Sequence, residues 1–207
     1  MFDPRILPFH QLHRGERVFL LASGPSLTTL PLDRLRGQVV MGLNRSALAF
    51  PETQYHCAMD RWLFRRHPSL LRRCPTLFTV PDRPFGIPLR LLDDEDERVG
   101  PDGFSLDLRE GIYSGRSVAY FALQVAVWMG FQEIVYLGLD LAHGPTTHFF
   151  GNDHPRSNEK RLEIFRHIRT NLENAARLLQ PRGVRLVQCG SLHPVEGFEQ
   201  TAQLERK

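Results

Sequence analysis

The chain has 207 residues, 42% of them hydrophobic, and its net charge of +3 at pH 7 comes almost wholly from arginine. The length fits one domain, residues 1–207, of ordinary size, and no stretch approaches the roughly 20 apolar residues that span a bilayer, so the sequence predicts a cytoplasmic protein. The small charge and the lack of an aromatic and basic recognition motif predict no nucleic-acid partner. Arginine binds phosphate bidentately, which favours an anionic substrate or a peripheral contact with the inner membrane.

Apolar strands alternate with helices along the chain. Strands are predicted at residues 17–22, 38–43, 55–59, 76–80, 133–140 and 184–189. Helices are predicted at residues 27–36, 62–73, 114–130 and 158–180, and the third of these is amphipathic and ends at Gly130. Strands separated by helices predict an α/β fold, a single Rossmann-like three-layer domain with a mostly parallel sheet.

Residues 81–111 interrupt this alternation, because they are rich in proline, glycine and acidic residues. We predict an irregular insertion there, either a lid or a small subdomain. The acidic run from Asp93 to Glu97 is typical of a solvated segment rather than of a metal site.

Small or polar residues follow the ends of the predicted strands. They are Ser23, Gly24, Pro25 and Ser26 after the first strand, Asn44 after the second, Asp60 after the third and Asp140 as the last residue of the fifth, with Ser114 and Gly115 opening a helix. Parallel sheets bind ligands beyond these ends, glycine admits a ligand close to the backbone, and helix N-termini bind phosphate. Each feature also has a local explanation as a turn or a helix cap. Together they predict a nucleotide crevice, although the chain has neither a G-x-G-x-x-G fingerprint nor a Walker loop.

Three histidines lie in the polar loop after the fifth strand, at His143, His148 and His154. Metal ligation is one interpretation, but zinc sites usually show tighter helical spacing or cysteines, so we predict no metal site. The second interpretation is general acid–base catalysis, because a histidine transfers protons near neutral pH. His67 and His167 lie on arginine-rich helix faces, and we expect both to be solvated.

The order of these segments resembles a known family. ASGPS after the first strand, Asn44 after the second, YSGRSVAYFALQVAVWMGFQEIVYLGLDL, and a histidine before the next helix resemble bacterial CMP-sialic-acid-dependent sialyltransferases of the single-domain, Rossmann-like kind. The chain is also similar to the broader group of motility-associated flagellin glycosyltransferases and archaeal 6-hydroxymethylpterin diphosphokinases. The resemblance covers residues 18–198 and is weakest over residues 81–111.

The resemblance implies roles for the segments. Residues 23–26 would contact the nucleotide, Asn44 the donor phosphate or ribose, and Ser114 with Gly115 the cytosine and ribose. His154, or as second choice His148, would act as general base on the acceptor hydroxyl of an inverting transfer. The donor would be a CMP-linked nucleotide sugar, the acceptor a surface glycan or lipopolysaccharide, and no cofactor would be required.

The chain departs from that family at several positions. Ser23 stands where the sialyltransferases have asparagine, Asp60 lies near the place of another asparagine, and Phe149 and Phe150 occupy a segment in which the family has tyrosines on the phosphate. Arg116 or Arg156 would then stabilise the phosphate.

Two alternatives follow from these departures. The first is a Mg²⁺-dependent pyrophosphokinase of the 6-hydroxymethylpterin diphosphokinase type, which would use Asp60 and Asp140. The second is a non-catalytic nucleotide- or glycan-binding module.

Overall fold

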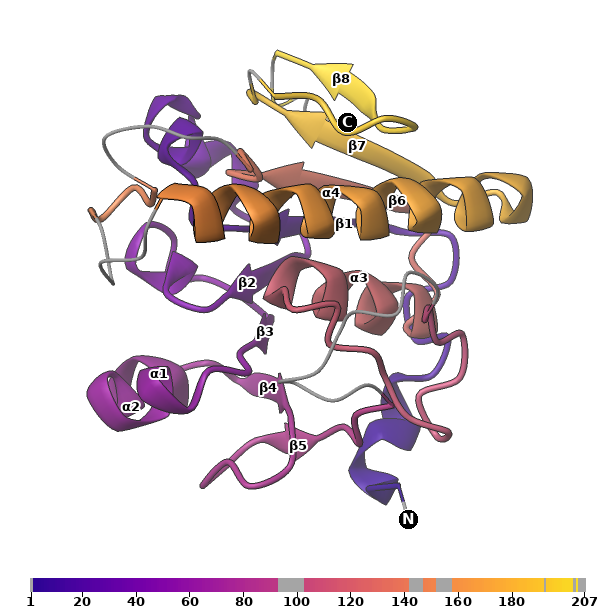
Figure 1. The fold of residues 1–207 in the computed structure, drawn as a ribbon. Helices are drawn as coiled ribbons and strands as arrows, with labels where there is room; N and C mark the ends of the chain where they lie inside the picture. The colour runs from indigo at the N-terminus through magenta and orange to yellow at the C-terminus, as the bar shows by residue number, and fades with distance from the viewer. Residues whose placement is uncertain are drawn as a thin grey trace.

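An eight-stranded sheet forms the centre of the molecule, and all its strands are parallel (Figure 1). The structure is a computed structural model that describes residues 2–92, 103–141, 147–151, 158–191, 193–202 and 204. The strand order is β5-β4-β3-β2-β1-β6-β7-β8. The strands are β1 Arg17–Leu21, β2 Val40–Leu43, β3 Tyr55–Cys57, β4 Thr76–Thr79, β5 Ile87–Pro88, β6 Glu133–Leu137, β7 Arg185–Cys189 and β8 Glu199–Thr201. The predicted α/β fold with a parallel sheet is confirmed.

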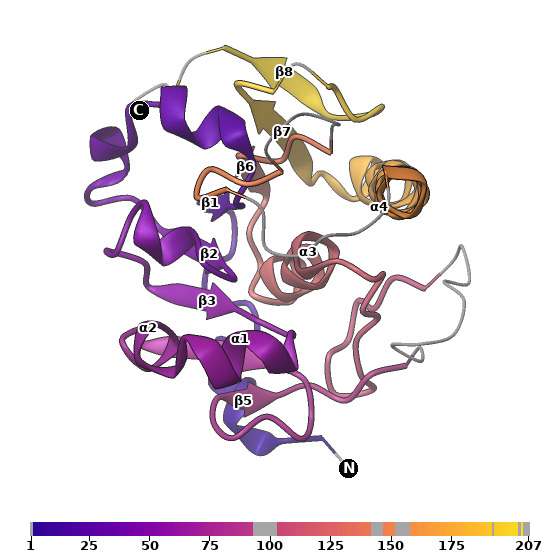
Figure 2. The ribbon, with the colours of Figure 1, turned by 60° about the vertical axis from the view of Figure 1, so that its left-hand side comes forward.

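Helical segments cover both faces of this sheet (Figure 2). The α-helices are α1 Arg61–Arg66, α2 Pro68–Arg72, α3 Val118–Trp128 and α4 Asn158–Leu179, and the 3₁₀ helices are η1 Pro4–Phe9, η2 Pro25–Thr29, η3 Leu32–Leu35, η4 Ser46–Leu48 and η5 Gln180–Arg182. Helices α3 and α4 pack on one face, while η2 and η3 close the other. Within the described part of the chain, no helix combines the length and the apolar character needed to cross a membrane.

Strand β1 shows why the central strands are largely apolar. Val18 and Leu20 belong to the core beneath α3 and α4, whereas Phe19 and Leu21 belong to the core on the opposite face. Side chains alternate between the faces of a strand, and both faces are covered here, so the four buried positions of β1 are all apolar.

The order in which strands are added to the sheet changes direction at β1. The chain runs outward through β2, β3, β4 and β5, and then returns to β6 on the other side of β1. Crevices beyond the carboxyl ends of strands form at such a switch point, so the topology places a crevice at the ends of β1 and β6.

Two predicted helices are interrupted in the structure. The segment predicted as one helix at residues 27–36 forms the two 3₁₀ helices η2 and η3, which are separated at Pro31. The helix predicted at residues 62–73 is divided into α1 and α2 at His67. Proline disfavours the helical conformation of the residue before it, and Pro68 therefore separates the two helices.

The third helix begins later than predicted, at Val118, and it is capped by Ser117 rather than by Ser114. All its residues except Val118 and Val127 are buried, so it is apolar on every side and not amphipathic. A helix of this kind must lie in the interior. The buried face of α4 is confined instead to residues such as Ile168, Leu172 and Leu179.

The two outermost strands were not predicted. Strand β5 lies inside the expected insertion and pairs with β4, and β8 consists of three residues in the tail. Both are short, and neither carries a continuous apolar run.

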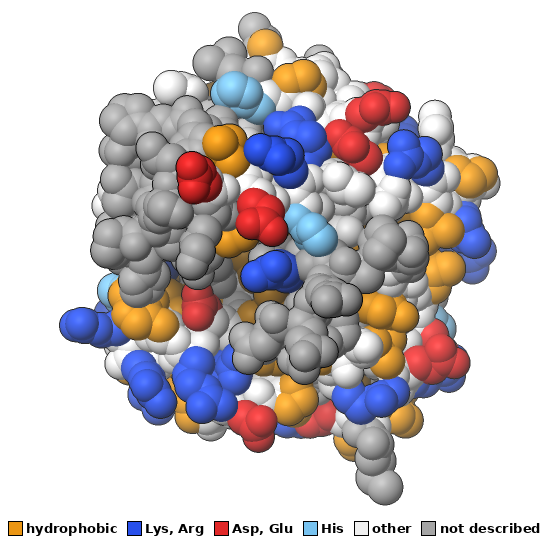
Figure 3. Space-filling model, viewed as in Figure 1, with side chains coloured by type: hydrophobic (Ala, Val, Ile, Leu, Met, Phe, Trp, Pro, Cys, Tyr) orange, Lys and Arg blue, Asp and Glu red, His pale blue; other side chains and the backbone are white. Residues whose placement is uncertain are grey.

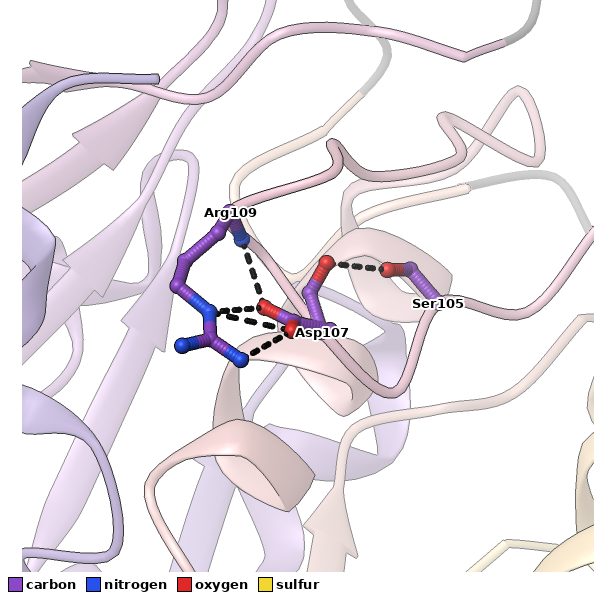
Figure 4. Close-up of polar contacts among 3 residues, drawn as sticks. All are labelled: Ser105, Asp107 and Arg109. Atoms are coloured by element: carbon purple, nitrogen blue, oxygen red, sulfur yellow. Dashed lines mark hydrogen bonds and ion pairs between the residues drawn. The ribbon is translucent and has the colours of Figure 1, made fainter.

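The described end of the expected insertion is anchored in front of α3. Gln124 on α3 is fully buried and accepts hydrogen bonds from the backbone N–H groups of Ser105 and Tyr113, at 2.9 and 3.2 Å. The Asp107 carboxylate accepts from the backbone and guanidinium of Arg109, and Ser105 Oγ donates to the Asp107 carbonyl (Figure 4). These contacts fix the position of the segment that leads to Ser114. Residues 93–102, which contain the DDEDE run, lie outside the described residues, and the lid stays a prediction.

Candidate functional site

A cavity of about 360 Å³ opens at the carboxyl ends of β1, β2, β3 and β6. Seven of the residues predicted from the sequence line it, namely Ser23, Gly24, Asn44, Asp60, Arg116, Asp140 and His148. Four more, Pro25, Ser26, Ser114 and Gly115, lie in the turns that carry these residues. His154 lies outside the described residues, as do His143 and Arg156.

The loops after β1 and β6 are joined in the floor of the cavity. The backbone N–H of Ser26 donates to Asp140 Oδ2 at 2.8 Å, and the backbone N–H of Gly24 donates to the Gly138 carbonyl at 2.8 Å. A Cβ atom on Gly24 would lie 2.4 Å from Asp140 Oδ2 and 2.5 Å from the Gly138 oxygen. The φ of Gly24 is −67°, which is accessible to any residue. Glycine is therefore needed here because the two loops approach each other closely, and not because of its backbone conformation.

The same loops present unpaired oxygen atoms. Asp140 Oδ1 and Ser26 Oγ are buried and have no hydrogen-bond partner among the described residues. Buried polar atoms are normally paired, so these atoms are available to a hydroxyl donor or to water. Because Asp140 lies three residues after β6, and not within the strand as predicted, its backbone is part of the loop.

Asn44 is held at the end of β2 by a buried histidine. His56 is fully buried on β3, and its Nε2 donates to the Asn44 carbonyl at 2.7 Å. Burial lowers the pKa of His56 to about 4, against the opposing effect of this hydrogen bond. The imidazole is therefore neutral, and it fixes Asn44 in the left-handed conformation, with φ +51°.

The side chain of Asn44 also has capacity to bind a ligand. Its Oδ1 is buried and has no hydrogen-bond partner among the described residues. The role of His56 was not predicted from the sequence, where the only signal for it is one polar residue in an apolar strand.

The Ser114–Gly115–Arg116–Ser117 segment is a tight turn that precedes α3. The Ser117 N–H donates to the Ser114 carbonyl at 3.0 Å, and Gly115 and Arg116 both have φ +52°. A Cβ atom on Gly115 would lie 2.3 Å from the Tyr120 ring. The turn brings Arg116 to the cavity rim, where its side chain is exposed.

Arg116 also affects the nearest histidine of α4. His167 is half-buried, and its pKa is lowered by burial and by the positive charge of Arg116. His67 is half-buried as well, with Nε2 3.3 Å from Arg45 Nη1. The expectation that both histidines are solvated is therefore wrong, because neighbouring elements cover one side of each ring.

Arg45, Trp62 and Phe150 form one wall of the cavity. The guanidinium carbon of Arg45 lies 3.5 Å from the centroid of the Phe150 ring and 5.7 Å from that of Trp62. His148 stacks on Phe150 with a centroid separation of 4.9 Å. Arg45 and Trp62 were not predicted as site residues, since neither belongs to a recognisable sequence motif.

Asp60 occupies the N-cap position of α1, and its side chain makes no capping hydrogen bond. Its carboxylate and that of Asp140 both line the cavity. Over the described ranges, no group of three or more histidine, cysteine, aspartate or glutamate side chains is arranged to hold a metal ion.

Comparison of the fold with solved structures finds a similar protein. The chain is similar to the sialyltransferase CstII from Campylobacter jejuni, solved in complex with the substrate analogue cytidine-5'-monophosphate, with a TM-score of 0.56, 14% identity, and coverage of 91% of this chain and 86% of that chain. A second structure, the terminal R domain of the myxalamid PKS-NRPS pathway, gives a TM-score of 0.30 at 10% identity and covers 52% of that chain. No protein-family model matches the sequence, and no curated protein matches it. The first match shows a shared fold.

Proposed function

We propose that the protein is a glycosyltransferase that takes a CMP-linked sugar as donor and a glycan hydroxyl as acceptor. The observation that most supports this is the cavity at the switch point of the sheet, which is lined by seven residues chosen from the sequence. The similarity in fold to a CMP-binding sialyltransferase over 91% of the chain agrees with it.

The proposed nucleotide site joins the two halves of the sheet. The turn at Ser23–Ser26 and the side chain of Asn44 would contact the phosphate and ribose, and the turn at Ser114 and Gly115 would support the base. The unpaired Oδ1 atom of Asn44 is suited to accept a ribose hydroxyl. Arg116 would stabilise the negative charge of the phosphate, because a guanidinium binds phosphate oxygens in pairs.

In the proposed reaction, the acceptor hydroxyl oxygen forms a bond to the anomeric carbon of the donor sugar. The bond between that carbon and the phosphate oxygen breaks, and CMP leaves with the electron pair. A histidine takes the hydroxyl proton, and attack opposite the leaving group inverts the anomeric configuration. No metal ion is needed for this sequence of steps.

We assign the base to His154, which precedes α4, and keep His148 as the second candidate because it lines the cavity. His154→Ala should abolish transfer from a CMP-sugar while CMP binding is retained. The matched control is His193→Ala, since His193 is exposed and does not line the cavity. If His154→Ala retains full transfer and His148→Ala does not, the base is His148. If both retain it, the histidine mechanism is wrong.

The second candidate function is a Mg²⁺-dependent nucleotide pyrophosphokinase, and it is favoured by the two carboxylates, Asp60 and Asp140, that line the cavity. These residues would bind a Mg²⁺ ion, which would neutralise part of the negative charge of the ATP phosphates. A thermal-shift series with CMP and with ATP, each with and without Mg²⁺, separates the two functions. A ligand at about a hundred times its Kd adds about 2.7 kcal/mol of stability. CMP stabilisation without Mg²⁺ supports the transferase, and ATP stabilisation that needs Mg²⁺ supports the kinase.

A further inference from the structure

Five arginines cover the outer surface of the two short helices beside the cavity. They are Arg61, Arg65, Arg66, Arg72 and Arg73, and all five are exposed. We call this surface the arginine face. Residues 61–81 contain no aspartate and no glutamate, although the chain has 23 acidic residues. Within the described part of the structure, none of the five guanidinium groups makes an ion pair. The arginine face is therefore a concentration of positive charge without ion-pair partners among the described residues, although the guanidinium carbon of Arg72 lies 4.7 Å from the centroid of the Phe85 ring.

Local helix electrostatics explain only part of this pattern. Arg65, Arg66 and Arg72 lie in the last turns of their helices, where a cation is favourable. Arg61 is the first residue of α1, where a cation is unfavourable, and neither helix has an acidic residue in its first turn. Like charges that are close together also repel, so stability alone does not favour this arrangement.

The arginine face adjoins the entrance to the cavity. Helix α1 begins directly after Asp60, and Trp62 and Leu63 of its first turn line the cavity. In Figure 3, basic side chains gather at the lower left, over the region where Figure 1 draws α1 and α2. A partner bound to the arginine face would lie next to the cavity.

An exposed apolar side chain lies in η4, a short helix whose preceding residue contacts α1. Leu48 in η4 is 54% exposed, and η4 is held beside α1 because its preceding residue, Arg45, lies over the Trp62 ring. Surfaces that combine arginines with exposed apolar residues are typical of proteins that bind the face of a bilayer.

We propose that the arginine face docks on an anionic phospholipid bilayer. This docking would orient the protein so that the cavity faces acceptors carried by that membrane. Arginine pairs with phosphodiester oxygens bidentately, and each basic residue near an anionic surface adds to the affinity independently of lipid identity. The orientation of the cavity rests on the proposed function, whereas binding to the bilayer does not.

Sedimentation with lipid vesicles tests this proposal. The full chain should bind vesicles of phosphatidylcholine with roughly one third phosphatidylglycerol, should bind phosphatidylcholine alone far more weakly, and should be released by salt. Arg61→Gln with Arg65→Gln should weaken binding about thirtyfold. The matched control, Arg177→Gln with Arg182→Gln, removes two exposed arginines from the far end of α4 and η5, and should leave binding unchanged.

Three results would overturn the proposal. They are equal binding to neutral vesicles, retained binding by the Arg61/Arg65 variant, and a lack of binding to the anionic vesicles, whether or not the protein binds DNA through the same arginines. CMP binding by the Arg61/Arg65 variant is measured in parallel. The affinity of this variant for CMP should equal that of the unaltered protein. Failure of the docking proposal would change only the vesicle result, whereas failure of the proposed nucleotide site would change only the CMP result.

Discussion

The carboxylate of Asp140 accepts a hydrogen bond from the backbone N–H of Ser26, with 2.8 Å between Oδ2 and the nitrogen. The two residues are 114 positions apart in the chain, and they follow the adjacent parallel strands β6 and β1. One side chain thus sets the spacing of the two loops that form the cavity floor, and its second oxygen remains unpaired among the described residues.

Asp140→Ala should lower the free energy of unfolding by about 1–3 kcal/mol, because the part-buried N–H of Ser26 loses its charged acceptor. Asp140→Asn retains an acceptor oxygen and should cost less. Equilibrium urea denaturation measures both, with Asp33→Ala as control, since Asp33 is exposed in η3. Equal losses for the alanine and asparagine variants would show that the hydrogen bond contributes little.

The asparagine variant also separates the two candidate functions. It removes a negative charge beside the proposed phosphate site, so CMP should bind at least as tightly as before. If Asp140 instead holds Mg²⁺, ATP binding that depends on Mg²⁺ should be lost. Isothermal titration calorimetry of the Asp140→Asn variant with CMP, and with ATP and Mg²⁺, measures both affinities.

Gly24→Ala should destabilise the protein and weaken CMP binding, because the new Cβ would lie 2.4 Å from Asp140 Oδ2 and 2.5 Å from the Gly138 carbonyl oxygen. Steric overlap of this kind costs roughly 1–3 kcal/mol. The double variant Gly24→Ala with Asp140→Ala removes only one of the two clashes, so it should not restore stability. Gly37→Ala is the comparison, since nothing lies within 4 Å of its Cβ position and only its φ of +78° opposes the change. A milder effect at Gly24 than at Gly37 would contradict the steric argument.

His56 should make the protein less stable as the pH falls. In the folded protein burial lowers the pKa of His56 to about 4, whereas in the unfolded chain the imidazole has its ordinary pKa of 6.5. Between these values the unfolded state binds the additional proton, so stability is complete above about pH 6.5 and declines towards pH 4, by up to about 3 kcal/mol. His56→Asn should remove this part of the pH dependence. Urea denaturation across this range compares the two proteins, and parallel curves would contradict the assignment.

The central strands could be predicted because burial on both faces favours a nearly continuous apolar run. Their polar successors could be predicted as well, since parallel strands carry the residues after them to one edge of the sheet. The wall formed by Arg45, Trp62 and Phe150 could not, because it arises from segments brought together only by folding.

The capping residue of α3 could not be predicted from the sequence, for a different reason. SGRS contains two serines with equal capping ability, and the turn selects Ser117 because Gly115 and Arg116 adopt left-handed conformations. A glycine in the sequence indicates that a left-handed conformation is accessible, whereas an arginine gives no such indication. The split between α1 and α2 was visible in the sequence, since a proline follows His67.

Arg116→Gly should separate stability from ligand binding. Arg116 has φ +52°, a conformation that costs most residues roughly 1–2 kcal/mol and glycine little. Glycine also makes the unfolded chain more flexible, at a cost of about 0.4–1 kcal/mol, so the two effects should nearly cancel and the free energy of unfolding should change by less than about 1 kcal/mol. CMP binding, in contrast, should weaken about tenfold or more, because a charge-assisted contact with the phosphate is lost. Calorimetric titration and urea denaturation of the same samples measure both quantities, with Arg116→Lys as the variant that keeps the charge and the strain. Unchanged CMP affinity in Arg116→Gly would show that this strained residue is not held at the cavity rim to bind phosphate.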